Sequence, residues 1–260
     1  MQKDFKSTIN VAELEQKVKS MYRDVALNPH GEYHFEMGRA LAERLGYNPA
    51  ELDKIPSEAI DSFAGVGYFF DLAQIKEGET VVDLGSGSGM DLFLASLKAG
   101  DTGKALGVDM TDEQLQKAGR LKEQKSFKNV SLHKSYIESL PFENEMCDVV
   151  ISNGVINLAP DKSKVFKEAA RILKQGGRLA IADIVTEKQL PENVVCNTTL
   201  WAACIGGASQ IDSYSDAIKK AGLEIIEIKQ NTQYGFISKS AKGASEEFGV
   251  KSVSILAVKR

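Results

Sequence analysis

Between residues 77 and 186, short apolar runs rich in β-branched residues alternate with longer segments whose apolar positions recur at helical spacing. Runs of this length, bounded by turn residues, are typical of buried strands. The pattern predicts strands at 80–84, 104–108, 130–135, 146–152 and 178–185, and helices at 92–99, 112–125 and 161–173. Because strands and helices alternate at short spacing, we predict an α/β fold with a Rossmann-like, doubly wound parallel sheet.

The two ends of the chain follow other patterns. Residues 1–76 lack strand-like alternation, and their apolar spacing predicts helices at 11–25, 33–45 and 65–75. We expect residues 1–76 to form a helical cap over the open edge of the sheet. The sheet itself belongs to a second domain, which spans residues 77–260. Helices that merely pack on the sheet and cover nothing fit the pattern as well. The remaining expected elements are a helical insert at about 190–210, a helix at 212–221 and two closing strands at 223–229 and 252–259.

A glycine-rich stretch, D-L-G-S-G-S-G-M, joins the first predicted strand to its helix at residues 83–90. Glycines at alternating positions let the backbone turn tightly and approach a ligand with no Cβ in the way. The dinucleotide fingerprint G-x-G-x-x-G would need its third glycine where this chain has Met90, which disfavours a nicotinamide cofactor. A plain strand-to-helix turn remains the alternative to a cofactor loop.

The alternating glycines, with Asp83 before them and Asp109 ending the next strand, are similar to the first motif of class I S-adenosylmethionine-dependent methyltransferases. The resemblance implies a seven-stranded sheet of order 3-2-1-4-5-7-6. It also implies that the loop holds the methionine part of the cofactor and that Asp109 accepts from both ribose hydroxyls, a task that suits an acceptor-only carboxylate. The residues implied around S-adenosylmethionine are Asp83, Gly85, Gly87, Gly89, Asp109, Met110, Ile137, Glu138, Asn153 and Val155.

From about Gly46 onward the chain also resembles the microbial arsenite methyltransferases, most specifically in S-N-G-V-I-N-L-A-P-D-K at 152–162. That family binds trivalent arsenic through cysteine thiolates. Two of the three cysteine positions here hold Val66 and Gly154, and only Cys204 of W-A-A-C remains. A thiophilic ion held by one thiolate would bind weakly. We therefore expect a small-molecule acceptor, with arsenite not the preferred one.

The predicted acceptor pocket has the candidates Tyr68, Asn157, Trp201 and Cys204, for which ordinary core packing is the alternative. A sulfonium methyl group is already activated, so the enzyme mainly has to align the acceptor. No base is required for a soft acceptor, and no histidine–carboxylate pair stands out in the sequence. An arsenite methyltransferase with a reduced cysteine set and a non-catalytic S-adenosylmethionine-binding protein remain alternative interpretations.

Composition narrows the class of partner. Charged residues make up 26% of the 260 residues and the net charge is −4, so no broad basic field favours a nucleic-acid partner. The three cysteines have no metal-binding spacing, and we expect no metal site. No apolar run is long enough to span a bilayer and the N-terminus lacks a signal-peptide core, so we expect a cytoplasmic protein without a membrane partner. The oligomeric state is left open.

Overall fold

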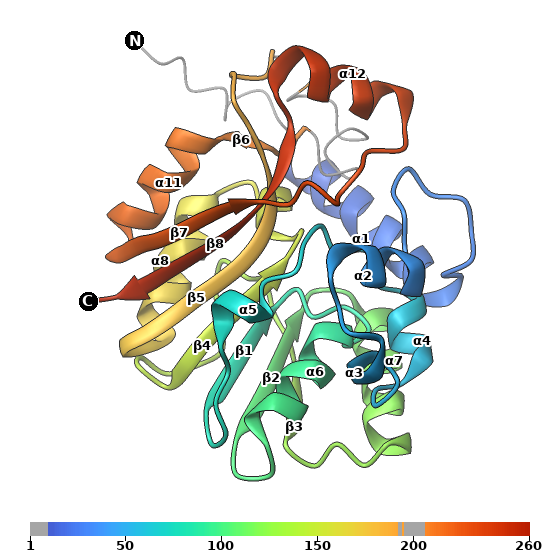
Figure 1. The fold of residues 1–260 in the computed structure, drawn as a ribbon, viewed down its shortest axis with the longest axis vertical. Coiled ribbons are helices and arrows are strands. Elements are labelled where there is room, and N and C mark those ends of the chain that lie inside the picture. Colours follow the sequence, from blue (N-terminus) through green and yellow to red (C-terminus); the bar gives the residue numbers. More distant parts are fainter. Residues whose placement is uncertain (1–9, 192–193, 195–205) are drawn as a thin grey trace.

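The computed structural model describes residues 10–191, 194 and 206–260, and its centre is one mixed sheet (Figure 1). The strands are β1 Thr80–Leu84, β2 Lys104–Asp109, β3 Val130–Lys134, β4 Cys147–Asn153, β5 Leu173–Thr186, β6 Ser209–Gln210, β7 Leu223–Gln230 and β8 Lys251–Lys259. Their order is β3-β2-β1-β4-β5-β8-β7, with the two-residue β6 beside β5. β1 to β5 run parallel, whereas β8 is antiparallel to both β5 and β7.

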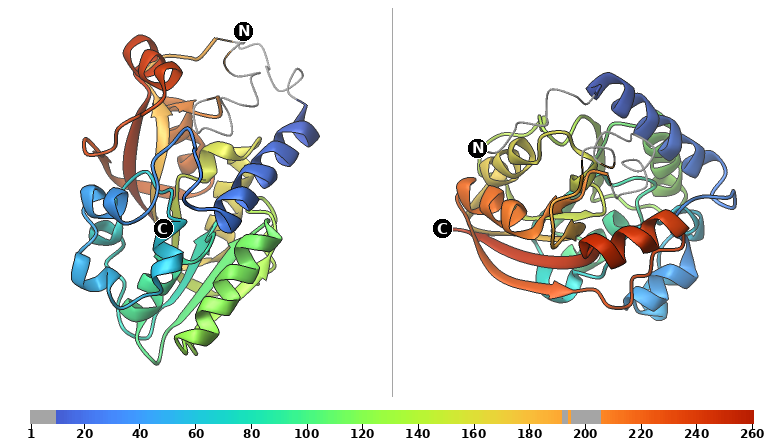
Figure 2. Two further views of the ribbon diagram at one scale, coloured as in Figure 1. Left: turned by 90° about the vertical axis from the view of Figure 1, so that its right-hand side faces the viewer. Right: turned by 90° about the horizontal axis from the view of Figure 1, so that it is seen from above.

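Helices cover both faces of this sheet. They are α1 Val11–Leu27, α2 Arg39–Leu45, α3 Pro49–Leu52, α4 Ser57–Asp61, α5 Phe70–Ala73, α6 Met90–Ala99, α7 Asp112–Gln124, the 3-10 turn η2 Ile156–Leu158, α8 Lys162–Ile172, α11 Ile211–Lys220 and α12 Lys239–Phe248. Figure 2 shows α1 running beside α7 at one side of the molecule. The N-terminal helices and α6 share one buried cluster, and α8 and α11 belong to a second.

Burial on both faces explains why the strands read as continuous apolar runs. In β1, Val81 packs into the cluster with the N-terminal segment, and Val82 packs into the cluster on the opposite face. In β4, Val149 packs into the first of these clusters and Val150 packs into the second. Alternate residues point to opposite faces of a strand, so a strand covered on both sides needs apolar residues at every position.

The predicted sheet order 3-2-1-4-5-7-6 is confirmed for the seven principal strands. The structure adds the short strand β6, and α12 lies in the connection between β7 and β8, where no helix was predicted. The strand predicted at 178–185 begins earlier, because Gly176 and Gly177 lie inside the long strand β5. The pairing register of β4 and β5 shifts there, and Gly176 has φ +73, which a glycine adopts without strain.

Two predicted N-terminal helices are shorter than the sequence pattern indicates. The segment expected as a helix at 33–45 is helical only in α2, because Gly38 with φ +83 stops it at the N-terminal side. Ahead of Gly38, Phe35 stacks on both Tyr22 and Tyr33. Thr111 stands at the N-cap position of α7, but its side chain makes no capping hydrogen bond.

The helix expected at 65–75 is limited to α5, because tertiary hydrogen bonds hold the preceding residues in an extended path. The backbone N–H groups of Val66 and Gly67 donate to Asn153 Oδ1 at 2.7 and 3.3 Å. From the other side, Ser252 Oγ donates to Val66 O at 2.6 Å and Ser254 Oγ donates to Tyr68 O at 3.0 Å. These bonds replace those that a helix would provide.

Gly67→Ala should lower the free energy of unfolding by about 2 kcal/mol or more, because the added methyl group has no space. A Cβ at this position would lie 2.8 Å from Ala182 Cβ and would also contact the Asn231 amide. Urea denaturation measures the effect. Gly235→Ala is the matched control, since nothing lies within 4 Å of its Cβ position. Equal stability of the two variants would contradict the described path of this segment.

Candidate functional site

A pocket of about 490 Å3 opens at the carboxyl ends of β1, β2 and β4. Ligands of doubly wound sheets bind at this edge, where loops from neighbouring strands converge. The residues predicted around the cofactor all line this pocket: Asp83, Gly85, Gly87, Gly89, Asp109, Met110, Ile137, Glu138, Asn153 and Val155. Residues far apart in the sequence are therefore brought together in one place.

The glycine loop folds back onto the end of β2. Gly85, Gly87 and Gly89 have φ values of +72, +53 and +99, a region that other residues enter only with strain. The N–H groups of Gly85 and Ser86 both donate to Val108 O, at 2.8 and 2.9 Å. The loop thus presents its backbone to the pocket in a shape that alternating glycines make accessible.

Asp109 is tied to the glycine loop through its carboxylate. Its Oδ2 accepts from Gly87 N at 3.0 Å, and its Oδ1 accepts from Thr111 N at 2.8 Å. Burial raises the pKa of Asp109, against the lowering effect of hydrogen bonds from the backbone of Thr111, Gly87 and Met110 and from the Thr111 side chain. A carboxylate only accepts hydrogen bonds, so this side chain suits a ligand with neighbouring hydroxyl groups.

Two buried polar atoms in the pocket wall have no partner among the described residues. They are Asp83 Oδ2 and Ser86 Oγ, and their residues are 3% and 8% exposed. Burial raises the pKa of Asp83 well above its usual range, and the charges of Asp91 and Asp109 raise it further. Leaving such groups unpaired costs about 1–3 kcal/mol each, so a ligand that supplies donors here would offset that cost.

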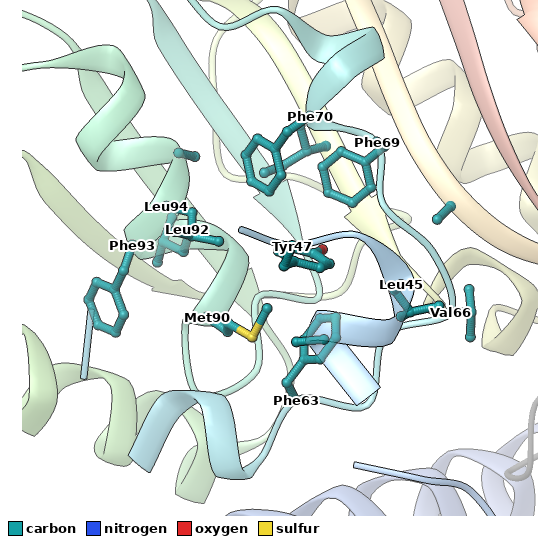
Figure 3. Close-up of a cluster of buried hydrophobic side chains, with 14 of the residues drawn as sticks. Leu45, Tyr47, Phe63, Val66, Phe69, Phe70, Met90, Leu92, Phe93 and Leu94 are labelled. Carbon is teal, nitrogen blue, oxygen red and sulfur yellow. The ribbon is translucent and has the colours of Figure 1, made fainter. Parts of the chain in front are cut away.

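Asp91, in the first turn of α6, is a site residue that the sequence reasoning missed. Its Oδ1 accepts from the Tyr47 hydroxyl at 2.7 Å, and its Oδ2 accepts from Asn153 Nδ2 at 3.0 Å. The Tyr47 ring lies between Phe63 and Phe70, beside Met90 (Figure 3). A lone acid on a helix whose other residues are mainly apolar was the available signal.

Acidic residues outnumber basic residues in the lining of the pocket. Asp83, Asp91 and Asp109 all line it, and none of them forms an ion pair with any described residue. Within the described ranges, Lys164 is the one basic residue in its lining. Charges act strongly in a site partly removed from water, so this pocket favours a cationic ligand.

Gln114 connects the glycine loop to α1. It is only 2% exposed, and its Oε1 accepts from Ser88 Oγ at 2.6 Å while its Nε2 donates to Tyr22 O at 2.8 Å. Five residues of α1 line the pocket: Val11, Leu14, Glu15, Val18 and Tyr22. The first helix therefore forms one wall of the same site.

A second connection joins α1 to the loop after β3. The Tyr136 hydroxyl donates to Glu15 Oε1 at 2.5 Å, and Lys19 Nζ lies 2.6 Å from that oxygen and 2.7 Å from the Tyr136 hydroxyl. Lys19 also lies over the Tyr136 ring, 4.8 Å from its centre. Because Glu15, Tyr136 and Ile137 line the pocket, this cluster links two sides of its rim.

The residues predicted to contact the acceptor do not share the position of the predicted cofactor residues. Tyr68 packs edge-on against Tyr47, with ring centres 5.0 Å apart, and Asn157 is fully buried with its N–H donating to Asp183 Oδ2. Neither lines this pocket, so their role at the acceptor stays a prediction. Trp201 and Cys204 lie outside the described residues.

Val66 and Gly154, which occupy the two altered cysteine positions, are direct neighbours in space. A Cβ on Gly154 would lie 3.2 Å from Val66 Cγ1. Val66 is 1% exposed, and Gly154 has φ +71, a conformation that suits glycine. Across the described ranges, no group of three or more histidine, cysteine or acidic residues is arranged to hold a metal ion.

Comparison with known proteins identifies the family. A family model described as a methyltransferase domain matches residues 75–230, more than half of the chain. The chain belongs to this family, the class I S-adenosylmethionine-dependent methyltransferases. The family confirms the Rossmann-like fold and S-adenosylmethionine as the cofactor predicted from the sequence.

Several relatives of this chain are named arsenite methyltransferases. The chain is 39% identical to an arsenite methyltransferase of Halobacterium salinarum over 187 residues, which are 72% of this chain and 48% of that protein. It is 42% identical to the human arsenite methyltransferase over 137 residues, 49% of this chain and 36% of that protein. The chain thus spans about half or less of the length of these relatives.

Solved structures agree with the fold. The crystal structure of an arsenic(III) S-adenosylmethionine methyltransferase from Chlamydomonas reinhardtii matches with a TM-score of 0.64 and 29% identity, over 86% of this chain and 74% of that one. A geranyl diphosphate C-methyltransferase from Streptomyces coelicolor A3(2) matches with a TM-score of 0.70 over 95% of this chain and 98% of that one. At 17% identity, the second likeness concerns the fold alone. In the described part of the chain, no helix combines the length and apolarity needed to cross a bilayer.

Asp91→Asn should change how stability depends on pH. Burial raises the pKa of Asp91 from 3.8 to about 6, so the folded protein holds this proton more tightly than the unfolded chain does. The stabilising contribution is therefore present at low pH and is lost as the pH rises through about 6. Between pH 5 and pH 8, the free energy of unfolding of the wild type should fall by about 1.4 kcal/mol relative to the variant.

Urea denaturation of the cofactor-free protein at both pH values measures this difference. Glu123→Gln removes one charge from a side chain that is 79% exposed and serves as the control. A difference between the wild type and Asp91→Asn that stays constant with pH would contradict a raised pKa at Asp91.

Proposed function

We propose that this chain transfers a methyl group from S-adenosylmethionine to a small-molecule acceptor. The main support is the glycine loop whose Gly87 N–H is hydrogen-bonded to Asp109, in a pocket with unpaired polar atoms and three uncompensated carboxylates. S-adenosylmethionine supplies an activated methyl group on a positively charged sulfonium. The arsenite methyltransferases that this chain resembles are methyltransferases by name, although it spans only part of their length.

In this proposal, different lining residues bind different parts of the cofactor. Asp109 accepts the hydroxyl groups of the ribose with the lone pairs that Gly87 and Thr111 leave available. Met110 and Ile137 offer apolar surface next to it for a flat ring system. Asp83 precedes the glycine loop and Ser86 lies within it, and their unpaired oxygens accept donors from the amino-acid end.

Pocket charge also favours release of the product. Methyl transfer converts a sulfonium into a neutral thioether, so the product carries one positive charge fewer than the cofactor. The carboxylates of Asp83, Asp91 and Asp109 therefore stabilise the bound cofactor more than the bound product. This difference promotes release of S-adenosylhomocysteine after the reaction.

The segment up to residue 76 acts as a cap in this proposal. Residues of α1 line the pocket, and Tyr136 bonded to Glu15 joins α1 to the loop beyond β3. A cap excludes water from the reacting groups and holds the acceptor in line with the methyl group. The insert at about 190–210, which lies largely outside the described residues, completes the acceptor side.

The acceptor, we propose, is not arsenite by preference. Val66 and Gly154 face each other at the positions where related enzymes carry thiols, so this chain lacks a thiolate pair there. Cys147 offers no substitute: it is fully buried at the start of β4, its thiol donates to Ile172 O, and burial raises the pKa of that thiol to about 12. In this proposal the acceptor is instead a thiol, an amine or a quinone-like molecule.

Arsenite methylation with a reduced cysteine set is the second candidate. The observation that favours it is the 39% identity with the Halobacterium salinarum arsenite methyltransferase over 72% of this chain. Cys204 would be the thiolate that such a reaction uses.

Asp109→Ala should weaken S-adenosylmethionine binding by about 2 kcal/mol, or roughly 30-fold, because the carboxylate bonds to the ribose are lost. Isothermal titration calorimetry measures the affinity. Asp112→Ala is the matched control, since its carboxylate is exposed and pairs with Lys134. Unchanged affinity of the Asp109 variant would contradict the proposed position of the ribose.

An acceptor screen separates the candidate functions. Purified protein should produce S-adenosylhomocysteine with at least one thiol, amine or phenolic acceptor and give little product with arsenite. Strong arsenite methylation that Cys204→Ser abolishes would instead support the second candidate. Cofactor binding without turnover on any acceptor class would indicate a non-catalytic binding protein.

A further inference from the structure

Part of the pocket lining is formed by α1 and not by the predicted cofactor residues. Those residues come from the carboxyl ends of β1, β2 and β4 and from the loop after β3. Val11, Leu14 and Val18 of α1 line the same pocket. Positions i, i+3 and i+7 fall on one face of a helix, so these three side chains form a continuous apolar strip along the pocket.

The apolar strip runs from solvent into the interior. Val11 is 48% exposed although it is large and apolar, whereas Leu14 and Val18 are 2% and 3% exposed. Leu14 and Val18 belong to the buried cluster that also contains Phe63, another residue of the pocket lining. An apolar molecule that lies along the strip would remove Val11 from water and would meet a dry surface further in. A small polar molecule would leave the strip unused.

Helix α1 is fastened to its neighbours, so the apolar strip has a defined position. Gln114 Nε2 donates to the carbonyl oxygen of Tyr22 at 2.8 Å, and Ser62 Oγ donates to that of Val25 at 3.2 Å. Gln114 is 2% exposed and Ser62 is 8% exposed, so both donors are shielded from competing water. A wall that is already in position costs a ligand little free energy of ordering on binding.

The carboxylate that α1 contributes to the lining is compensated. Glu15 Oε1 lies 2.6 Å from Lys19 Nζ and accepts from the Tyr136 hydroxyl at 2.5 Å. The acidic residues beside the glycine loop, by contrast, have no basic partner among the described residues. The pocket therefore has a charged part beside the glycine loop, which suits a sulfonium, and an apolar part on α1, which suits a hydrocarbon.

We propose that the apolar strip of Val11, Leu14 and Val18 binds a hydrocarbon chain of the methyl acceptor, and that the enzyme prefers acceptors that carry such a chain. The inference rests on the proposed function, because the strip serves the transfer only if the cofactor occupies the part of the pocket beside the glycine loop. The chain lies along α1, and the nucleophilic atom at its end meets the sulfonium methyl group.

The transfer itself is balanced for a thiol acceptor. The acceptor sulfur forms a bond to the methyl carbon, and the bond between that carbon and the sulfonium sulfur breaks with its electron pair left on the cofactor. The thiol proton passes to solvent. The hydrocarbon chain takes no part in these steps, so its contact with the strip contributes equally to binding of the acceptor and of the transition state.

Calorimetric titration of the protein saturated with S-adenosylhomocysteine measures this contact. The probes are ethanethiol, butanethiol and hexanethiol, and because S-adenosylhomocysteine has no methyl group to donate, the heat reports binding alone. We expect the affinity to rise about fourfold for each methylene group that the strip buries. Equal affinities for the three thiols, or binding of none of them, would overturn the inference.

A pair of variants on α1 locates the chain. Val11→Ser should weaken binding of hexanethiol roughly tenfold and leave binding of ethanethiol almost unchanged, since only the longer chain reaches the solvent end of the strip. Leu27→Ser is the matched control, because Leu27 is 69% exposed on the same helix and does not line the pocket. Equal losses in the two variants, or equal losses for the two thiols, would contradict the proposed position of the chain.

The outcomes separate this inference from the proposed function. If the wild-type protein does not bind S-adenosylhomocysteine in the absence of thiol, the proposed function fails. If it binds S-adenosylhomocysteine but its affinity for thiols does not depend on chain length, the hydrocarbon site on α1 fails and the proposed function stands. With S-adenosylmethionine and hexanethiol, Val11→Ser should raise KM and leave kcat unchanged, as expected for a contact that is equal in both states.

Discussion

The side chain of Asn153 joins three parts of the chain at the end of β4. Its oxygen accepts from the backbone of Val66 and Gly67, and its nitrogen donates to Tyr47, Asp91 and Gly67 O. The N-terminal segment, the first helix after the glycine loop and the central strand are thereby fixed against each other. Without this amide, the extended segment at 64–68 would lose its main polar contact on the pocket side, and Asp91 would lose one of its two donors.

The polar groups of this pocket lower the stability of the folded protein. Three carboxylates lie close together without a basic partner in the described part of the chain, and two polar atoms in the wall are unpaired. Replacement by apolar residues would be expected to increase stability, as is common at functional sites. A cation with suitable donors is the kind of ligand that relieves this cost, and it does so only while it is bound.

The relation to arsenite methyltransferases is close in sequence and different at the acceptor positions. Val66 and Gly154 lie against each other, so the fold still brings these two positions together although neither carries a thiol. In the proposed function, a change of residue type at these two neighbouring positions alters which acceptor the enzyme prefers. The cofactor side, which depends on the glycine loop and Asp109, is independent of that change.

The strand order was implied by the resemblance to class I methyltransferases. The sequence by itself determined the parallel sheet and placed the candidate cofactor residues at one edge of it. It could do so because the glycine loop, Asp109 and Asn153 all follow strands, and the carboxyl ends of parallel strands meet at one edge whatever the loops do. The central strands β1 and β4 and the second half of β5 also appear as apolar runs, since burial on both faces leaves a local pattern.

Only the tertiary structure decided the polar network beside that edge. Tyr47 and Asp91 are 44 residues apart, Asn153 is 62 residues from Asp91 and 106 from Tyr47, and no local pattern links them. The helix expected at 65–75 failed for the same reason, because bonds from Asn153, Ser252 and Ser254 hold its first residues extended. Propensity acts over a few neighbouring residues, whereas these hydrogen bonds form between segments that meet only after the sheet has assembled.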